Sequence, residues 1–485
     1  MPSGRSALRT LALAALLLAP AAPLGAQEPA FAPGRTTERV AARSDTTQKY
    51  AVYVPSAYSE ARTWPVLVVM DPRGRALFAL DLFREAAERH GWIVFSSYRT
   101  LSDADTASDV NHRALEAILR DAERLRVDPR RLYLAGFSGT ARQGWTMAYG
   151  LQGNVAGFIG VGGGFPGPDG IWRTLLNGVQ PPFAFFGASG GVDFNENEMF
   201  SADTVLDHTS LPHRVVRFEG GHTWFPKEVA AEAVTWMQLQ AVKARLAPRD
   251  SALADSVFGA RMAAARALEA AGETGDAYLQ YRSAATDFAG LLDVTAAGEA
   301  AGRLERDGRV RRALERRRAL EKEVVRYKIA AEEYAESLRD LPRMPADART
   351  FARLRLAELK RQAADSTDRE AARAAGAMLE FTYVVYAFYE PRRYLDRGDP
   401  ARALASLRVA REIKPENPFV CWSFALAHAQ AGDRDAAFRE LECAERGAIL
   451  TVAALEREPF LEPLRADARF GALLERVRAA PPPAR

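Results

Sequence analysis

The sequence predicts two structural parts: an α/β domain with a mostly parallel sheet, followed by an all-α region. Between residues 49 and 246, short apolar runs of β-type residues alternate with segments of helical periodicity. Such alternation is typical of a parallel sheet with helices on both faces. Past residue 248 the strand patterns stop, and Ala, Leu, Arg and Glu dominate a series of helical periods. The length of 485 residues agrees with more than one domain, because a domain usually holds ~100–200 residues.

The first 26 residues have the pattern of a secretory signal peptide. Arg5 and Arg9 precede an apolar run over residues 11–18, and Gly25 and Ala26 provide a small-residue cleavage site. A membrane anchor is the alternative, but a span needs ~20 apolar residues. We therefore expect export to the periplasm or the medium, with no membrane span after cleavage. Residues 27–46 show no period and are expected to form a flexible leader.

Composition and charge exclude several classes of function. Hydrophobic residues make up 48% and charged residues 26% of the chain, as in ordinary soluble proteins. The signal segment holds two arginines and no acidic residue, so the net charge falls from +3 to +1 without it. A nearly neutral chain gives no electrostatic reason to expect nucleic acid or an acidic membrane as a partner.

The α/β domain, residues 47–247, is expected to contain seven strands and the helices between them. The predicted strands are 50–54, 66–70, 93–97, 132–135, 157–161, 183–186 and 214–218. The predicted helices are 77–90, 110–126, 140–149, a short one near 197–208, and 226–246. In such sheets ligands bind at the carboxyl ends of the strands, so the loops at those ends are where functional residues are expected.

One of these loops has the outline of a nucleophile elbow. Residues 131–140 read Arg-Leu-Tyr-Leu-Ala-Gly-Phe-Ser-Gly-Thr, a short strand running into a tight turn with Ser138 at its tip. A serine hydroxyl must project from the backbone if a base and a carbonyl are both to reach it, and small neighbours such as Gly136 and Gly139 allow this. The usual pattern is G-x-S-x-G, whereas this sequence has Thr140 at the last position.

Two further loops follow predicted strands and complete the order Ser, Asp, His. The loop after 183–186 contains Asp193 among glycines, and the loop after 214–218 reads Glu-Gly-Gly-His-Thr-Trp with His222 in it. Of the six histidines, His222 is the one in a glycine-flanked loop at the carboxyl end of a strand.

This order and spacing resemble the α/β-hydrolase family over about residues 45–246, in particular its small secreted esterase and depolymerase-like members. The resemblance implies that Ser138 is the nucleophile, His222 the general base and acid, and Asp193 the group that orients the imidazole. Asp203, Asp207 and Asp169 are alternatives for the acid. The resemblance also implies an oxyanion hole formed by the N–H of Gly139 and a second donor from the loop after residue 70, where Arg73 is the candidate and Gly74 the fallback.

The segment between 161 and 183 is too short for a large lid, so we expect an open cleft. Phe137, Phe165, Trp172 and Trp224 are expected to line it in part, although aromatic residues at these positions are also compatible with core packing. The sequence contains no His or Cys cluster with metal-ligand spacing and no phosphate-binding glycine loop, so no metal or cofactor is implied.

The second part contains an internal repeat of 34 residues. Gly398-Asp399 recurs as Gly432-Asp433, and small residues recur at matching positions. The pattern resembles the tetratricopeptide repeat over about residues 384–448, which implies a scaffold that binds a protein partner. Residues 384–485 are thus expected to form repeats with capping helices, and residues 248–383 a helical region of degenerate repeats.

Cys421 and Cys443 lie at similar distances on either side of the Gly432 turn. An antiparallel helical hairpin would bring them together, and a disulfide could form in an oxidising compartment. Two small buried residues at a helix interface are the alternative.

Three functions agree with the sequence. The first is an exported serine hydrolase that cleaves small-molecule or polymeric carboxylic esters through an acyl-enzyme. The second is a catalytically silent hydrolase-like domain within a protein-binding scaffold. Thr140 suggests it, because it stands where the usual pattern has glycine. The third is a serine peptidase on the same three residues, because ester and amide cleavage share the mechanism.

Overall fold

The computed structural model of the chain describes residues 31–102, 107–151, 153–164, 183–339 and 348–480. The expected signal peptide, Asp169, Phe165 and Trp172 lie outside these residues.

An eight-stranded sheet forms the centre of the first part of the chain. Its strand order is β1-β2-β4-β3-β5-β6-β7-β8, with β1–β2 and β2–β4 antiparallel and all other pairs parallel. The strands are β1 Arg35–Ala41, β2 Lys49–Val54, β3 Trp64–Met70, β4 Ile93–Ser97, β5 Val127–Phe137, β6 Val155–Val161, β7 Ala184–Gly190 and β8 His213–Phe218. The parallel strands β3 to β8 place their carboxyl ends at one edge, where the three predicted loops meet.

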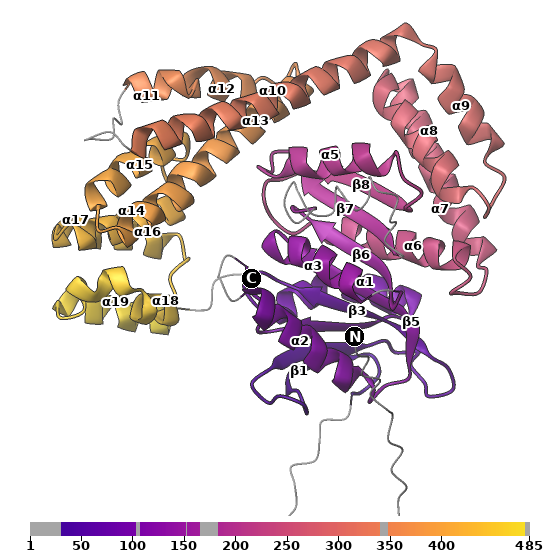
Figure 1. Ribbon diagram of the computed structural model, residues 1–485, viewed down its shortest axis with the longest axis horizontal. Helices are drawn as coiled ribbons and strands as arrows, with labels where there is room; N and C mark the ends of the chain where they lie inside the picture. The colour runs from indigo at the N-terminus through magenta and orange to yellow at the C-terminus, as the bar shows by residue number, and fades with distance from the viewer. Residues whose placement is uncertain (1–30, 103–106, 152, 165–182, 340–347, 481–485) are drawn as a thin grey trace, which may run out of the picture.

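Helices cover both faces of this sheet (Figure 1). The helices α1 Ala76–His90 and α6 Lys227–Lys243 pack with one set of strand side chains in a common core. The opposite face is covered by α2 Ala107–Ala122, α3 Gly139–Gly150 and α5 Glu196–Leu206. This arrangement confirms the predicted fold class: an N-terminal α/β domain with a mostly parallel sheet, followed by a large helical region.

The expected flexible leader contains a strand, which corrects the prediction for residues 27–46. β1 pairs antiparallel with β2, and its register shifts between Thr37 and Val40. Only Val40 of this strand is buried, so the segment lacks the alternating apolar pattern that announces a strand. Its backbone hydrogen bonds to β2, rather than its side chains, hold it in place.

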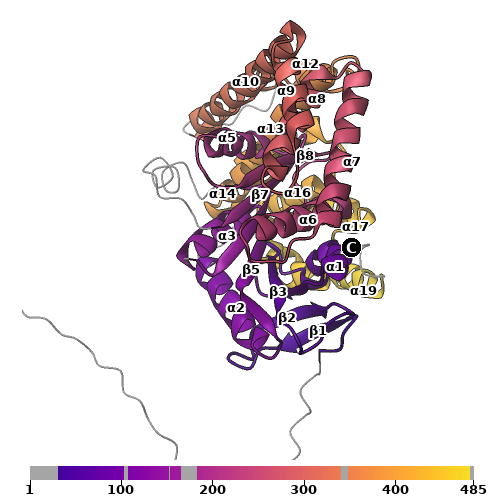
Figure 2. The ribbon, with the colours of Figure 1, turned by 90° about the vertical axis from the view of Figure 1, so that its right-hand side faces the viewer.

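The second part of the chain, which begins after α6, consists of helices in the described residues. Its elements are α7 Ser251–Ala270, α8 Thr274–Phe288, α9 Thr295–Glu305, α10 Gly308–Arg339, α11 Ala348–Arg353, α12 Leu356–Ala363, α13 Arg369–Val384, η1 Val385–Tyr389, α14 Glu390–Asp396, α15 Pro400–Ile413, α16 Pro418–Gln430, α17 Arg434–Arg446, α18 Val452–Arg457, η2 Pro459–Leu464 and α19 Ala468–Ala479. Figure 1 shows this region arching around the α/β domain: α7 to α9 stand on one side, the long α10 crosses above α5, and the last helices come down on the other side. Figure 2 shows α7 beside α6, where the two parts join.

The predicted boundary at residues 383 and 384 falls inside a continuous helix. α13 passes through the π-helical turn η1 into α14, and one hydrophobic core runs from Val324 of α10 to Leu473 of α19. Pro391, which has no N–H to donate, is the second residue of α14, and a proline is tolerated in the first turn of a helix. The helices from α10 onward therefore belong to one unit.

The 34-residue spacing corresponds to two equivalent turns. Gly398 and Gly432 both have positive φ, 72° and 80°, as is usual after the end of a helix. Asp399 and Asp433 then cap α15 and α17, each accepting a hydrogen bond from the N–H three residues later. Identity with the tetratricopeptide family stays a prediction.

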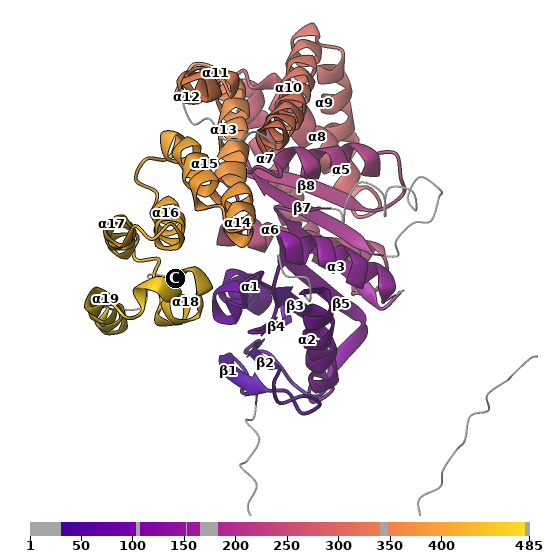
Figure 3. The same ribbon diagram turned by 60° about the vertical axis from the view of Figure 1, so that its left-hand side comes forward.

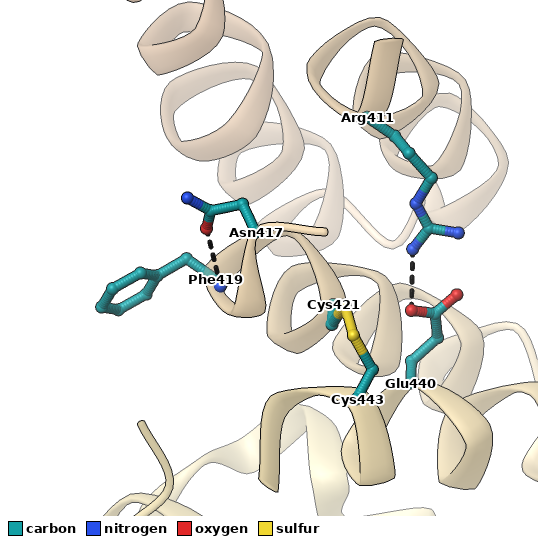
Figure 4. Close-up of a disulfide and its surroundings, with 6 residues drawn as sticks. All are labelled: Arg411, Asn417, Phe419, Cys421, Glu440 and Cys443. Atoms are coloured by element: carbon teal, nitrogen blue, oxygen red, sulfur yellow. Dashed lines mark hydrogen bonds and ion pairs between the residues drawn. A yellow bond between two sulfur atoms is a disulfide. The ribbon is translucent and has the colours of Figure 1, made fainter. Parts of the chain in front are cut away.

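The two cysteines are joined in the structure. A disulfide links Cys421 of α16 to Cys443 of α17, with the Cα atoms 5.9 Å apart (Figure 4). Glu440 lies on the same helix as Cys443 and accepts a 2.7 Å hydrogen bond from Arg411 of α15. Both contacts tie α17 to the helices before it.

Among the described residues, none of the helices combines the length and the apolar character that a membrane crossing requires.

Candidate active site

Ser138 occupies a strained turn between β5 and α3. Its φ of 55° and ψ of −125° are sparsely populated by residues other than glycine. The turn is possible because its neighbours lack side chains: a Cβ at Gly136 would lie 2.6 Å from the carbonyl oxygen of Thr140, and one at Gly163 would lie 2.6 Å from that of Ser138. The predicted elbow is therefore present as a backbone conformation, with the Ser138 side chain at its tip.

Thr140 takes the place of the usual glycine by turning its hydroxyl into the protein. Its Oγ1 is fully buried, lies 2.7 Å from the carbonyl oxygen of Met70 and 2.8 Å from that of Phe137, and accepts the N–H of Phe137 at 3.1 Å. A buried hydroxyl with these partners costs little desolvation free energy and links the elbow to the end of β3. The departure from the usual pattern thus leaves the turn intact.

The imidazole of His222 lies between Ser138 and Asp193. Its Nε2 is 2.8 Å from Oγ of Ser138, and its Nδ1 is 2.9 and 3.0 Å from the two carboxylate oxygens of Asp193. Asp193 is fully buried, and its Oδ1 also accepts the N–H of Asn195 at 2.7 Å. His222 is thus within hydrogen-bond distance of both Ser138 and Asp193, although the sequence places the three residues in separate loops.

This geometry can activate the hydroxyl. With Nδ1–H donated to the carboxylate, Nε2 is the acceptor for the Ser138 proton, and a buried carboxylate stabilises the imidazolium that results. The contact through both nitrogens fixes the ring orientation, so proton transfer requires no rearrangement of the histidine.

Two of the other candidate acids, Asp203 and Asp207, lie away from His222. Asp203 and Asp207 face His213 at the start of β8, at 3.7 and 3.4 Å from its Nε2. Asp207 also approaches Arg282 of α8 at 3.8 Å. These carboxylates lie near the amino end of β8, whereas His222 follows its carboxyl end, so Asp193 is the acid that the fold brings to the histidine.

The Arg73 amide is engaged elsewhere, which differs from its expected role as second oxyanion donor. Its N–H donates to Oδ1 of Asp71 at 2.9 Å, and the fallback Gly74 donates its N–H to the carbonyl oxygen of Asp71 at 3.0 Å. Asp71 is fully buried, and a buried carboxylate is stable only if nearby groups donate hydrogen bonds to it. Gly139, as the first residue of α3, does present its N–H at a helix N-terminus, where N–H groups have no partner within the helix.

Phe137 and Trp224 are core residues, which corrects their expected place on the wall of the cleft. They are only 7% and 4% exposed. The Phe137 ring lies 4.7 Å from the His222 ring and 5.7 Å from that of Trp224, whose Nε1 donates to Asp71 at 2.9 Å. Phe137 therefore packs against the imidazole, and Trp224 packs against Phe137.

Three residues of the site were missed by sequence reasoning. Asp71 joins the loop after β3 to the loop of His222, because it accepts the hydrogen bond of Trp224. Burial by itself raises the pKa of Asp71, but the hydrogen bonds and the charge of Arg75 outweigh it. The pKa of Asp71 therefore lies below its usual value. Asn195 donates from Nδ2 to the carbonyl oxygen of Gly162 at 2.8 Å. Both follow a strand at its carboxyl end, a signal that could have identified them. The third, Lys328, comes from α10, and no local pattern marks it.

Comparison with known proteins gives structural neighbours for the α/β domain. No family model and no curated protein matches the chain. An S-formylglutathione hydrolase, FrmB, of Staphylococcus aureus is similar at 12% identity and a TM-score of 0.32, covering 39% of this chain and 90% of its own. FphF, a fluorophosphonate-binding serine hydrolase of the same organism, has 12% identity, a TM-score of 0.34 and coverages of 42% and 98%. A feruloyl esterase module of Clostridium thermocellum, complexed with sinapinate, has 13% identity, a TM-score of 0.34 and coverages of 42% and 86%.

Proposed function

We propose that this protein is an exported serine hydrolase that cleaves carboxylic esters through an acyl-enzyme on Ser138. The observation that carries the proposal is the pair of contacts on His222: 2.8 Å from Nε2 to Oγ of Ser138, and 2.9 Å from Nδ1 to Asp193. The strained elbow supports it further, because a residue in such a conformation persists only where the surrounding structure imposes it.

The proposed reaction has two halves. In the first, Oγ of Ser138 attacks the ester carbonyl carbon while Nε2 of His222 takes the hydroxyl proton, and the leaving alcohol departs with that proton. In the second, His222 takes a proton from water, the hydroxide oxygen attacks the acyl carbon, and the carboxylic acid is released as the proton returns to Oγ. Asp193 holds the imidazole tautomer in both halves, and the N–H of Gly139 stabilises the negative oxygen of each tetrahedral intermediate.

The helical region is proposed to act as a scaffold for a protein partner, with export depending on residues 1–26. N-terminal sequencing of the protein recovered from the periplasm or the medium should then begin at Gln27. A mature protein that still carries residues 11–18 would contradict this assignment.

A fluorophosphonate probe tests the proposed reaction independently of the natural substrate. The purified protein is expected to react once per chain, and peptide mass spectrometry should place the adduct on Ser138, because only an activated serine reacts at a useful rate. Heat-denatured protein is the control, since unfolding separates Ser138 from His222. A folded protein without an adduct would indicate the silent scaffold, and a labelled protein that cleaves peptides but no esters would indicate a peptidase.

A further inference from the structure

A lysine of the helical region is buried against the loop that contains Asp193. Lys328 of α10 is 7% exposed, and its Nζ donates to the carbonyl oxygen of Phe194 and to Oδ1 of Asn197. Phe194 directly follows Asp193 in the chain, and its ring lies 4.2 Å from the His222 ring. The ammonium group thus holds the backbone of the residue next to the acid.

α13 presses on the same loop from a second direction. A Cβ on Gly376 would lie 2.7 Å from Cγ1 of Val192, so the helix backbone approaches the loop as closely as a glycine permits. The aliphatic part of Arg373 makes a similar approach to Gly191. The Phe194 side chain packs against the hydrophobic core of the helical region, and Figure 3 shows α10 and α13 at the end of the sheet that β7 and β8 form. Residues 191–194, here called the acid loop, are thus held between the sheet and the helical region.

The charges around Lys328 come from both parts of the chain. Its largest charge interaction is with Asp193, followed by those with Glu196, Glu198 and Glu332. Two of these acids already have cationic partners, because Glu196 is paired with Arg217 of β8 and Glu198 with Arg142 of α3. Arg373 of α13 also interacts with Glu196. Burial lowers the pKa of Lys328 to about 8.

We propose that Lys328 is a positioning residue of the active site: it fixes the acid loop so that Asp193 faces His222, and its positive charge acts on the Asp193–His222 pair. This inference rests on the proposed function, and it makes the helical region part of the hydrolytic site. A buried lysine costs desolvation free energy that an apolar side chain of similar length would not. Its hydrogen bonds to the carbonyl oxygen of Phe194 and to Oδ1 of Asn197 offset part of this cost.

The charge of Lys328 has a predictable sign of effect. A cation near Asp193 repels the positive charge that His222 gains when it takes up a proton. Removal of the ammonium favours the imidazolium. The pH above which the site becomes reactive then rises.

The test measures the rate constant of fluorophosphonate inactivation against pH for the full chain and for Lys328→Met. The variant is expected to react about 10- to 100-fold more slowly at its plateau, because small displacements of catalytic groups have effects of this order. The midpoint of its acid limb is expected to rise by about one pH unit. Lys328→Arg should keep the midpoint near that of the wild type, since it retains the charge.

Lys360→Met is the matched control. Lys360 of α12 also donates to a backbone carbonyl and a side-chain oxygen, both from Glu412, but these partners lie within the helical region. Its rate and midpoint should equal those of the wild type. Thermal unfolding of each variant by circular dichroism shows whether a loss of rate comes from a loss of folded protein.

Asn197→Ala separates position from charge, and it also serves if Lys328→Met does not fold. It removes one acceptor of Lys328 while the ammonium stays, so the rate should fall several-fold with an unchanged midpoint. Two outcomes overturn the inference. In the first, both variants fold and react as the wild type does. In the second, Lys328→Met reacts more slowly with an unchanged midpoint, and Asn197→Ala reacts at the wild-type rate. A wild type that does not react at all contradicts the proposed function instead.

Discussion

Ser138→Ala is expected to lower the hydrolysis of a p-nitrophenyl ester by about six orders of magnitude, and to abolish fluorophosphonate labelling. Without Oγ no acyl-enzyme can form, and only binding and the oxyanion donor remain to accelerate attack by water. The fold should persist, because alanine removes a single oxygen atom and the strain at φ 55° is borne by the backbone. The measurement is kcat at saturating ester, corrected for the uncatalysed rate.

The matched control is Ser96→Ala on β4. Ser96 is buried in the same sheet and donates from Oγ to the carbonyl oxygen of Val69 at 3.1 Å, so this variant also loses one hydroxyl. It should keep the wild-type kcat and lose about 1 kcal/mol of stability. Equal activity in Ser138→Ala and wild-type protein would remove Ser138 from the reaction and with it the proposed mechanism.

Asp193→Asn should lower kcat by about 10⁴-fold with little change of structure. The N–H of Asn195 donates to Oδ1 of Asp193, and this contact would select the orientation in which the new amide oxygen stays on Asn195 and the NH₂ group faces His222. Nδ1 must then accept a hydrogen bond, and Nε2 carries the proton. A histidine in this tautomer cannot take the proton of Ser138.

Asp203→Asn is the comparison for this variant, because Asp203 is one of the alternative acids and its carboxylate faces His213. It should retain kcat. The reverse result, with Asp203→Asn inactive and Asp193→Asn active, would exchange the roles of the two residues. Raising the pH should not restore Asp193→Asn, since the defect is one of tautomer and not of titration.

The sequence predicts best what local patterns determine. The strands β3, β4 and β6 and the helices α1 and α3 are found within a few residues of their expected positions, because buried runs and helical periods are strong local signals. The loops of Ser138, Asp193 and His222 could be placed together because parallel strands share one edge. β1 was missed since it buries a single side chain.

What the sequence did not predict depends on contacts between distant segments. The Arg73 amide is turned to Asp71 by a local hydrogen bond that no pattern marks. Trp224 was expected in the cleft, but its Nε1 donates a hydrogen bond in the core to Asp71, which is 153 positions away in the sequence. Lys328 is 134 positions from Phe194, and in the sequence it lies among charged residues that mark an exposed helix surface.

The continuous helix from α13 through η1 to α14 restricts how the molecule can move. Its first segment touches Val192 at Gly376, while its last segment belongs to the core shared with α16 and α19. Because both ends of this helix are packed, it can tilt only if its backbone bends, and the irregular part of the backbone is the π-helical turn Val385–Tyr389. A displacement of the C-terminal helices must therefore either bend this π-helical turn or shift the peptide units that flank Asp193.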